Sequence, residues 1–447
     1  MPTRIGLGTT VAHKARRGNS TRAWSAVIKW PVSSKRLLLL IPTTTYRTED
    51  FVDAARKLDV DLVIASDRPN VMSAEFPDHL LTLPFSEPET AVKEIRRFAE
   101  RRPLDAVVPV DDLTTVVAAA ICQDLGLRAN PIGAVSATRN KLTMRELLAK
   151  SGAPSPAFTS WSVDEDPRAA ARQVSYPCVL KPLVLSASRG VIRADGEAEF
   201  VAAFARIRAI LASDDLSELG EGKDRILVEA FIPGTEVALE GLLDEGRLHT
   251  LALFDKPDPL DGPFFEETIY VTPSRLPEPV QAAIRDATAK AAGALGLRDG
   301  PVHAELRMNR DGEGRDIAWM IEIAARSIGG LCSRTLSFGT GMSLEEIILR
   351  HALGLPIASL ERDRRAAGVM MIPIPRGGIL DAVHGLDEAR ALPSIEDVTI
   401  SMHMGQDVIP LPEGSRYLGF IFSRAETPFQ AETALRRAHA RLHFVIR

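Results

Sequence analysis

The chain has 447 residues, which is enough for two or three domains. Its hydrophobic content of 45% and charged content of 25% are those of an ordinary water-soluble globular protein. A net charge of -5 argues against nucleic acid as the main partner, because phosphate binding requires an excess of basic residues. The longest candidate apolar run, residues 37–42, is too short to span a membrane.

Two further features bear on location. Cys122, Cys178 and Cys332 lie far apart without CxxC spacing, so neither a disulfide framework nor a zinc site is indicated and a reducing cytoplasm fits. Residues 1–34 form a basic extension that contains no acidic residue. This composition would suit a transit peptide, but we favour a disordered tail or an over-extended start codon.

From residue 35 to residue 130 the pattern alternates strand and helix, which predicts a parallel α/β domain. The first strand is not followed by Gly-x-Gly-x-x-Gly, so dinucleotide binding has no support. Asp111 and Asp112 end the third strand, where they either face a site or cap the next helix. The predicted strands are 36–42, 61–66 and 104–112, and the predicted helices are 48–60 with Thr48 as N-cap, Glu89–Arg101 and Leu113–Leu125.

The next unit begins with a helix that Gly152 and Pro154 end, followed by a strand, a loop of small residues and another strand. Lys181 ends the first of these strands, and the loop contains Ser186 and Ser188. Small residues let backbone N–H groups approach phosphate oxygens while a lysine supplies charge. Alone this signal is weak, since GxxxxGK[ST] is missing, and Lys141 by itself resembles any surface lysine.

Consecutive strands follow a helix at 197–212 and a polar linker. Glu229 begins a short apolar link through Ala230 and Phe231, and Glu236 and Glu240 follow a Pro-Gly turn. The backbone of such a link can bind a purine edge, and a following carboxylate can accept hydrogen bonds from ribose, although ordinary exposed acids at strand ends are the simpler reading. Glu240 interrupts an apolar run and is therefore expected to face something polar.

Residues 301–330 read as a hairpin of two alternating strands around a Gly- and Asp-rich turn. Period 2 puts Glu305 and Arg307 on one face of the first strand, and Glu322, Ala324 and Arg326 on one face of the second. A divalent cation with a phosphate chain would occupy such a set of carboxylates and guanidinium groups. The alternative is a solvated hairpin with ordinary surface charges. A helix, a β-rich tail from residue 365, a last helix and a last strand complete the chain.

The order of these features resembles the ATP-grasp superfamily: two lysines, E-x-F/Y-x-x-G-x-E, then E and E-x-x-x-R on a hairpin. Within it the chain is similar to the L-amino acid ligases, on the grounds of VHAEL, IEIAARSIGG, DKPDPLDGPFFEETIYVTPS and PRGGIL. The resemblance covers residues 35–447. It implies a mixed α/β and α+β ATP-grasp fold, with an N-terminal parallel α/β domain at 35–130. An ATP-grasp domain at 131–352 (small lobe about 154–230) and a C-terminal α+β subdomain at 353–447 would follow.

The resemblance also implies roles for individual residues. Lys141, Lys181, Ser186, Ser188, Glu229, Ala230, Phe231 and Glu236 would bind ATP; Glu305 and Glu322 would bind Mg²⁺ or Mn²⁺; and Arg326 and Lys181 would be catalytic. The expected substrate contacts are Glu240, Glu267, Thr268, His303 and Arg326. In the loop at 263–274 either Glu266 or Glu267 could hold a substrate ammonium, and the alternative is a structural crossover with solvated acids. His303 has a second reading as a buried strand histidine, and Arg307 has no role. Ala324 stands where many ATP-grasp enzymes have Asn, a loss the amino acid ligases share.

The implied reaction joins a carboxylate to an amine through an acyl phosphate and releases ADP and phosphate, as in dipeptide synthesis. Small-molecule carboxylates and amines are the expected partners, and neither nucleic acid nor a membrane is expected. If the chain assembles with itself, a homodimer is the expected form. Two alternatives stand beside this reading. One is an ATP-grasp tailoring ligase for a non-proteinogenic or carrier-bound carboxylate, and the other is a non-catalytic nucleotide-binding module.

Overall fold

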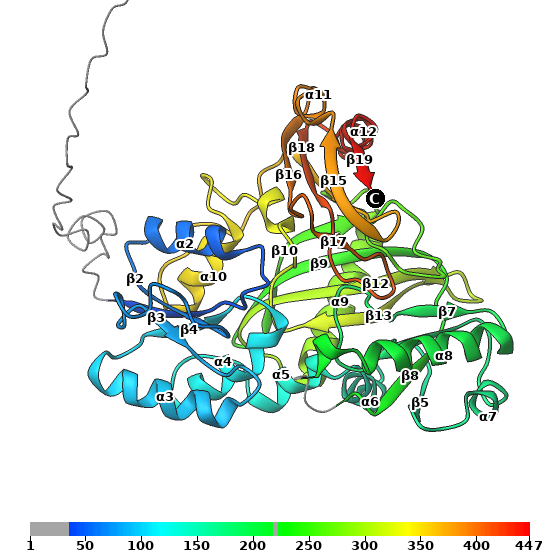
Figure 1. Ribbon diagram of the computed structural model, residues 1–447, viewed down its shortest axis with the longest axis horizontal. Helices are drawn as coiled ribbons and strands as arrows, with labels where there is room; N and C mark the ends of the chain where they lie inside the picture. Colours follow the sequence, from blue (N-terminus) through cyan, green and yellow to red (C-terminus); the bar gives the residue numbers. More distant parts are fainter. Residues whose placement is uncertain (1–34, 218–221) are drawn as a thin grey trace, which may run out of the picture.

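The computed structural model describes residues 35–217 and 222–447, and the predicted basic extension lies outside them. Four sheets make up the fold: a four-stranded parallel sheet, a four-stranded small lobe, a central eight-stranded sheet and a three-stranded sheet near the C-terminus (Figure 1). The predicted mixed α/β and α+β class is confirmed. No helix within the described ranges is both long and apolar enough to cross a bilayer.

The N-terminal sheet is parallel throughout, in the order β3-β2-β1-β4. β1 carries four consecutive leucines that are fully buried, as expected for a strand covered on both faces. Helix α2 packs on one face, and α3 and α4 pack on the other. The prediction that Thr48 caps α2 is wrong, because Arg47 holds the N-cap position and Thr48 is the first helical residue. The elements are β1 (Arg36–Leu40), β2 (Asp61–Ser66), β3 (Leu80–Thr82), β4 (Ala106–Pro109), α2 (Thr48–Lys57), α3 (Pro88–Arg101) and α4 (Asp112–Leu125).

The small lobe is an antiparallel sheet in the order β5-β8-β6-β7, covered by helix α8. Two helices lead into it, and they meet at Asn140, whose side chain caps the second by accepting from the N–H groups of Leu142 and Thr143. The second helix ends at Gly152, as predicted. The elements are α5 (Ile132–Arg139), α6 (Lys141–Ser151), β5 (Phe158–Ser162), α7 (Pro167–Ala171), β6 (Cys178–Pro182), β7 (Ile192–Ala194), α8 (Glu197–Leu211) and β8 (Arg225–Ala230).

The central sheet has the order β13-β12-β9-β10-β11-β14-β18-β16 and includes the predicted hairpin, β12 and β13. It runs without interruption from that hairpin into the C-terminal part of the chain, and the predicted domain boundaries stay predictions. Helix α9, which the sequence reading did not include, covers one face of the sheet. The elements are β9 (Thr235–Asp244), β10 (Arg247–Asp255), β11 (Ile269–Thr272), α9 (Glu278–Leu295), β12 (Gly300–Arg310), β13 (Asp316–Ala324), β14 (Ala366–Ile372), β16 (Ile395–Ile400) and β18 (Gly419–Ala425).

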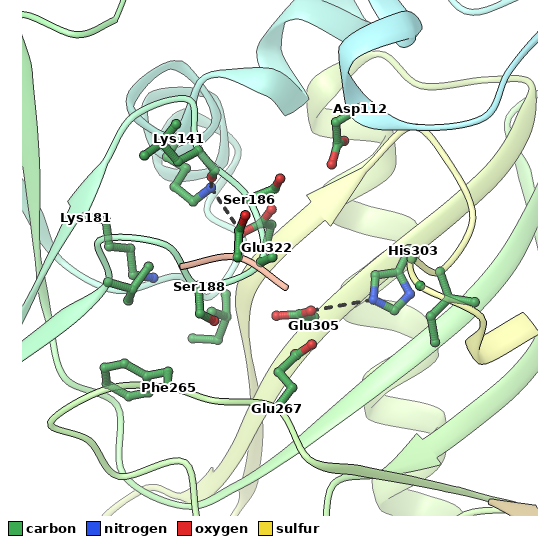
Figure 2. Close-up of a pocket in the computed structure, with 18 of the residues that line it drawn as sticks. Asp112, Lys141, Lys181, Ser186, Ser188, Phe265, Glu267, His303, Glu305 and Glu322 are labelled. Carbon is green, nitrogen blue, oxygen red and sulfur yellow. Dashed lines mark hydrogen bonds and ion pairs between the residues drawn. The ribbon is translucent and has the colours of Figure 1, made fainter. Parts of the chain in front are cut away.

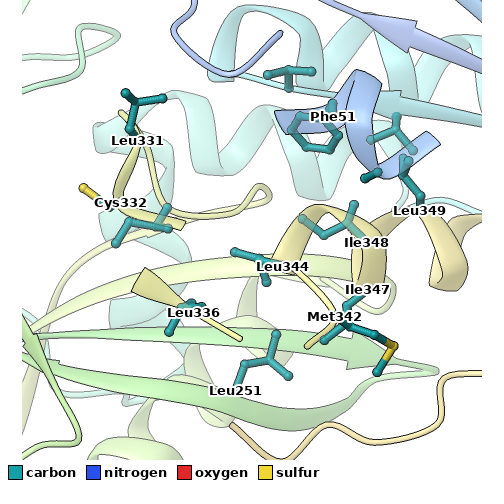
Figure 3. Packing of buried hydrophobic residues seen from close by; sticks show 14 of the residues in the cluster. Phe51, Leu251, Leu331, Cys332, Leu336, Met342, Leu344, Ile347, Ile348 and Leu349 are labelled. Atoms are coloured by element: carbon teal, nitrogen blue, oxygen red, sulfur yellow. The ribbon is translucent and has the colours of Figure 1, made fainter. Parts of the chain in front are cut away.

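A single hydrophobic cluster fixes the N-terminal sheet against the central sheet. Phe51 of α2, Ile348 of α10 and Leu251 of β10 all belong to it (Figure 3). The Ser343 hydroxyl caps α10 by accepting from the Glu346 N–H group. The remaining elements are α10 (Leu344–Ala352), β15 (Gly378–His384), α11 (Leu386–Arg390), β17 (Asp407–Val408), α12 (Pro428–His439) and β19 (His443–Ile446).

Candidate active site

A cavity of about 530 Å³ opens where the N-terminal sheet, the small lobe, the central sheet and residues 415–417 meet. Its wall combines carboxylates, lysines and small-residue loops with apolar side chains (Figure 2). The predicted site residues that line it are Lys141, Lys181, Ser186, Ser188, Glu229, Ala230, Phe231, Glu236, Glu267, His303, Glu305, Glu322 and Arg326. The two that lie outside the lining are Glu240 and Thr268; the Thr268 hydroxyl donates to Asp258.

The hairpin brings its two glutamates together. Glu305 of β12 and Glu322 of β13 are direct cross-strand partners, and both face the cavity. A β-bulge shifts the register between Glu305 and Leu306, so Met320 pairs with Leu306 and simple period 2 does not continue along β13. Glu322 forms an ion pair of 3.3 Å with Lys141, whose Nζ also donates to the carbonyl oxygen of Leu185 at 2.8 Å.

A second set of carboxylates lies beside the first. Oxygen atoms of Glu236, Glu267 and Glu305 lie within 4.8 Å of one another. Hard oxygen donors at this spacing suit Mg²⁺ or Mn²⁺, so the residues present fit a divalent cation. Lys256, which is 4% exposed, holds the three acids together through contacts with Glu236 at 2.8 Å, with Glu305 at 3.5 Å and with Glu267.

Lys256 is a residue that the sequence reading missed. Burial alone would lower its pKa, but the carboxylates of Glu236, Glu267 and Glu305 raise it well above its usual value. Burial and repulsion by Glu305 raise the pKa of Glu267. The available signal was a lysine that follows the apolar run of β10 and its last residue, Asp255, since a buried ammonium requires acidic partners.

Glu229 lies on β8 of the small lobe, between two cations. Its carboxylate contacts Arg145 at 2.6 Å and Lys181 at 2.7 Å, and all three side chains are buried. Burial alone would raise the pKa of Glu229, but Arg145 and Lys181 lower it to about 2. The Glu229 side chain thus orients Lys181. Lys181 lines the cavity beside the loop from Ser186 to Gly190, here called the serine loop.

The loop from Ser186 to Gly190 has an unusual backbone. Ala187 and Ser188 have φ angles of 53° and 55°, in the left-handed region that side chains other than glycine disfavour. Gly190 has a φ of 73°, and a Cβ atom added there would lie 2.6 Å from the Pro182 ring. The Gly190 N–H group donates to the carbonyl oxygen of Pro412 at 2.9 Å, so the C-terminal segment helps to hold the loop.

The first backbone donors of the link after β8 are used within the protein. The N–H groups of Ala230 and Phe231 donate to the carbonyl oxygens of Ala157 and Pro177. Ile232 also lines the cavity, and no described group accepts from its N–H. Arg193 and Arg307 both stack on the Phe231 ring, with guanidinium carbons 4.1 Å and 4.9 Å from its centroid.

Arg307, to which the sequence reading gave no role, supports the turn after this link. Its guanidinium donates to the carbonyl oxygens of Gly234 and Leu260 and to the carboxylate of Asp261 at 2.9 Å. It also lies 4.0 Å from Glu236. These contacts fix the position of Glu236 on the cavity wall.

Arg326 follows the end of β13 and donates to Asp112 at 2.8 Å. Asp112 is the first residue of α4, and its neighbour Asp111 holds the N-cap position. Both roles that the sequence left open for this pair are therefore present. Asp111 caps α4, and both residues line the cavity. Burial alone would raise the pKa of Asp112, but Arg326 and Arg139 lower it to about 2.

Comparison with known proteins agrees with this arrangement. The family model of the ATP-grasp domain matches residues 174–335, that of the ATP-grasp N-terminal domain matches 52–128, and that of the L-amino acid ligase C-terminal domain 2 matches 370–447. Alanine–anticapsin ligase of Bacillus subtilis (strain 168) is 28% identical over 273 residues, which is 58% of this chain. The alignment spans 56% of that relative, so this chain matches about half of its length.

Solved structures extend the comparison to nearly the whole chain. The L-amino acid ligase from Bacillus licheniformis superposes with a TM-score of 0.77 and 28% identity, over 92% of this chain and 99% of that one. The N5-carboxyaminoimidazole ribonucleotide synthetase from Thermotoga maritima has a TM-score of 0.66 over 92% of this chain and all of that one (100%), but at 17% identity it supports the fold alone. The chain therefore belongs to the ATP-grasp superfamily and, within it, resembles the L-amino acid ligases.

Proposed function

We propose that this protein is an ATP-dependent carboxylate–amine ligase that joins two amino-acid-like substrates through an acyl phosphate and releases ADP and phosphate. The observation that carries the proposal is the shared cavity, into which the Glu305–Glu322 pair, Lys141, Lys181 and Arg326 all face. Phosphoryl transfer needs positive charge around the phosphate oxygens, which the two lysines and Arg326 would supply directly and the two glutamates would supply by holding a divalent cation.

ATP would lie between the small lobe and the central sheet. The Ile232 N–H group and nearby carbonyl oxygens would bind the adenine, and Glu236 would accept hydrogen bonds from the ribose. Lys141, Lys181 and the loop containing Ser186 would contact the phosphates. Backbone N–H groups of that loop are suited to this task because its left-handed residues turn the chain sharply.

Glu305 would be the central ligand of the divalent cation, since it belongs to both carboxylate sets, with Glu322 on one side and Glu236 and Glu267 on the other. A bound Mg²⁺ or Mn²⁺ would neutralise charge on the phosphate oxygens. Lys256 would reduce the repulsion among Glu236, Glu267 and Glu305 through its contacts with all three.

Arg326 and Lys181 would stabilise charge that develops when the substrate carboxylate attacks the γ-phosphoryl group. The amine of the second substrate would then displace phosphate. Glu267 would contact the substrate side of the cavity, next to Phe265. The loop around Ser188, held by Pro412, would exclude the water that otherwise hydrolyses the acyl phosphate.

Two alternative functions differ from this proposal in ways that can be stated. A tailoring ligase for a non-proteinogenic or carrier-bound carboxylate would use the same residues and would differ only in product. A non-catalytic binding module is disfavoured because its cavity would not need Glu305, Glu322 and Arg326 together. We assign the protein to the cytoplasm on the ground that its three cysteines are free and buried.

The experiment is a matrix of amino acid pairs incubated with ATP and Mg²⁺, with phosphate release and product mass measured together. The proposal predicts ADP and one amide product only when both a carboxylate and an amine are present. Phosphate release from no pairing would contradict a dipeptide ligase, and AMP in place of ADP would contradict the acyl phosphate route.

A further inference from the structure

Glu240 is a fully buried carboxylate that does not reach the cavity. It lies in the middle of β9, where its neighbours along the strand are buried and mostly apolar. A buried carboxylate is costly unless hydrogen bonds compensate it. Its Oε2 accepts two such bonds, from His303 Nδ1 at 3.1 Å and from the Ile328 N–H group at 3.0 Å, while its Oε1 has no partner among the described residues.

The first bond leads to the carboxylates of the cavity. Glu240 and His303 are cross-strand partners on β9 and β12, so the sheet register itself places the ring beside the acid. The other ring nitrogen, Nε2, lies 3.5 Å from Glu305 Oε1 (Figure 2). Because His303 is only 6% exposed, its ring is packed between the two carboxylates and restricts where the Glu305 side chain can turn.

The second bond leads to the loop that carries Arg326. Ile328 follows Arg326 by two residues, and its side chain is buried in the cluster that joins the two large sheets. Arg326 itself is held at its far end by Asp112. Besides the packing of Ile328, two hydrogen bonds hold the loop: Arg326 donates to Asp112, and the Ile328 N–H group donates to Glu240.

We propose that Glu240 is a positioning residue that sets Glu305 and the Arg326 loop in one arrangement, through His303 on one side and the Ile328 N–H group on the other. The inference rests on the proposed function for the roles of Glu305 and Arg326. It replaces the expectation that Glu240 contacts substrate. Outer partners of this kind commonly affect metal affinity by about 10-fold to 100-fold.

The test compares three single variants of the full chain, with no ligase substrate present. Glu240→Leu removes both acceptors at similar volume. Glu240→Gln keeps an oxygen that can accept both bonds. Glu345→Leu is the matched control, because Glu345 is a buried acid that pairs with Arg47 at 3.0 Å and does not line the cavity. The readouts are hydrogen exchange at the Ile328 amide and Mn²⁺ affinity in the presence of a non-hydrolysable ATP analogue.

For Glu240→Leu we expect faster exchange at Ile328 and Mn²⁺ binding weakened by about 10-fold or more. Glu240→Gln should stay close to the wild type in both, and Glu345→Leu should lose stability without either change. Unchanged Ile328 exchange or unchanged Mn²⁺ affinity in Glu240→Leu would overturn this inference and leave the proposed function intact. A wild type that binds no Mn²⁺ would overturn the proposed function together with the Glu305 part of the inference.

If Glu240→Leu does not fold, the double variant Glu240→Gln with His303→Leu takes its place. It keeps the acceptor for the Ile328 N–H group, removes the ring beside Glu305 and leaves no unpaired buried charge. We expect protected Ile328 exchange and weakened Mn²⁺ binding. Wild-type Mn²⁺ affinity in this variant would overturn the inference.

Discussion

Arg326 and Asp112 are 214 positions apart in the chain and meet through a hydrogen bond of 2.8 Å. The bond connects the start of α4 in the N-terminal domain to the loop after the hairpin of the central sheet. The carboxylate of Asp112 therefore sets the position of the guanidinium that we propose for the reacting phosphate. Both side chains are mostly buried: Arg326 is 13% exposed and Asp112 is 17% exposed, so the contact is shielded from water.

Replacing Asp112 by Asn removes this charge from the Arg326 contact. A hydrogen bond to a charged group contributes about 1.5–3 kcal/mol, so we expect kcat for ADP formation to fall by about 10-fold to 100-fold. The KM for ATP should change less than kcat, because the ion pairs of Asp112 are with Arg326 and Arg139. The control is Asp124→Asn at the exposed end of α4, where Asp124 pairs with Arg96. Equal kinetics for the two variants would contradict the role given to Asp112.

Replacing Lys141 by Met removes the ammonium that contacts Glu322 and the Leu185 carbonyl oxygen. We expect the KM for ATP to rise by about 10-fold or more, because the charge-assisted contact to phosphate that we propose for Lys141 is lost. Lys150→Met lies on the same helix with an exposed side chain and serves as the matched control. Steady-state kinetics with varied ATP measures both, and a KM unchanged in the Lys141 variant would refute its phosphate role.

Gly190 and Gly246 form a matched pair for the serine loop. Both have positive φ angles, 73° and 88°, but an added Cβ would meet Pro182 at 2.6 Å in the first and nothing within 4 Å in the second. Alanine at either position costs about 1–2 kcal/mol of backbone strain. We expect only Gly190→Ala to raise the KM for ATP as well, because the clash displaces the loop. Equal ATP kinetics in the two variants would mean that the loop does not contact the nucleotide.

The ion pairs of Glu229 predict a pH dependence of stability. Its pKa is lowered from the ordinary 4.5 to about 2, so the folded state favours the ionised form. The resulting stabilisation, about 3 kcal/mol, is present above about pH 5 and is lost as the pH falls towards about 2. We expect Glu229→Gln to lower the free energy of unfolding at neutral pH and to matter less at about pH 3. Denaturant unfolding at both pH values measures this, and a difference independent of pH would contradict the account.

The hairpin shows how far the sequence reading could go. Alternation identified both strands and put Glu305 and Glu322 each on a polar face of its strand, because side chains of one face repeat every two residues. The direct pairing of Glu305 with Glu322 comes from the register of the structure. The sequence could not predict the β-bulge beside Glu305. An extra residue in one strand of a pair does not show in the pattern of polar and apolar residues. The sequence left open whether Asp112 faces a site or caps the next helix. Its partner, Arg326, comes from a distant part of the chain, so their contact could not be predicted.

Lys256 and α9 were missed for different reasons. Lys256 acts through three acids that the fold brings together from β9, β12 and the loop before β11, and no local pattern encodes that meeting. Helix α9 is rich in alanine, so its apolar face is weakly marked between Pro277 and Gly296. Glu240 is the opposite case: its place inside an apolar run predicted a polar neighbour, and the structure supplies His303 as that neighbour.

The most direct test of the ligase mechanism follows the substrate oxygen. A carboxylate substrate labelled with heavy oxygen, supplied with ATP, Mg²⁺ and an amine, should transfer one labelled atom to the released phosphate and none to ADP. Glu305→Gln should abolish this transfer, because the carboxylate that we propose as the metal ligand is lost. Label that stays out of phosphate while amide forms, or label that enters AMP, would contradict the acyl phosphate mechanism.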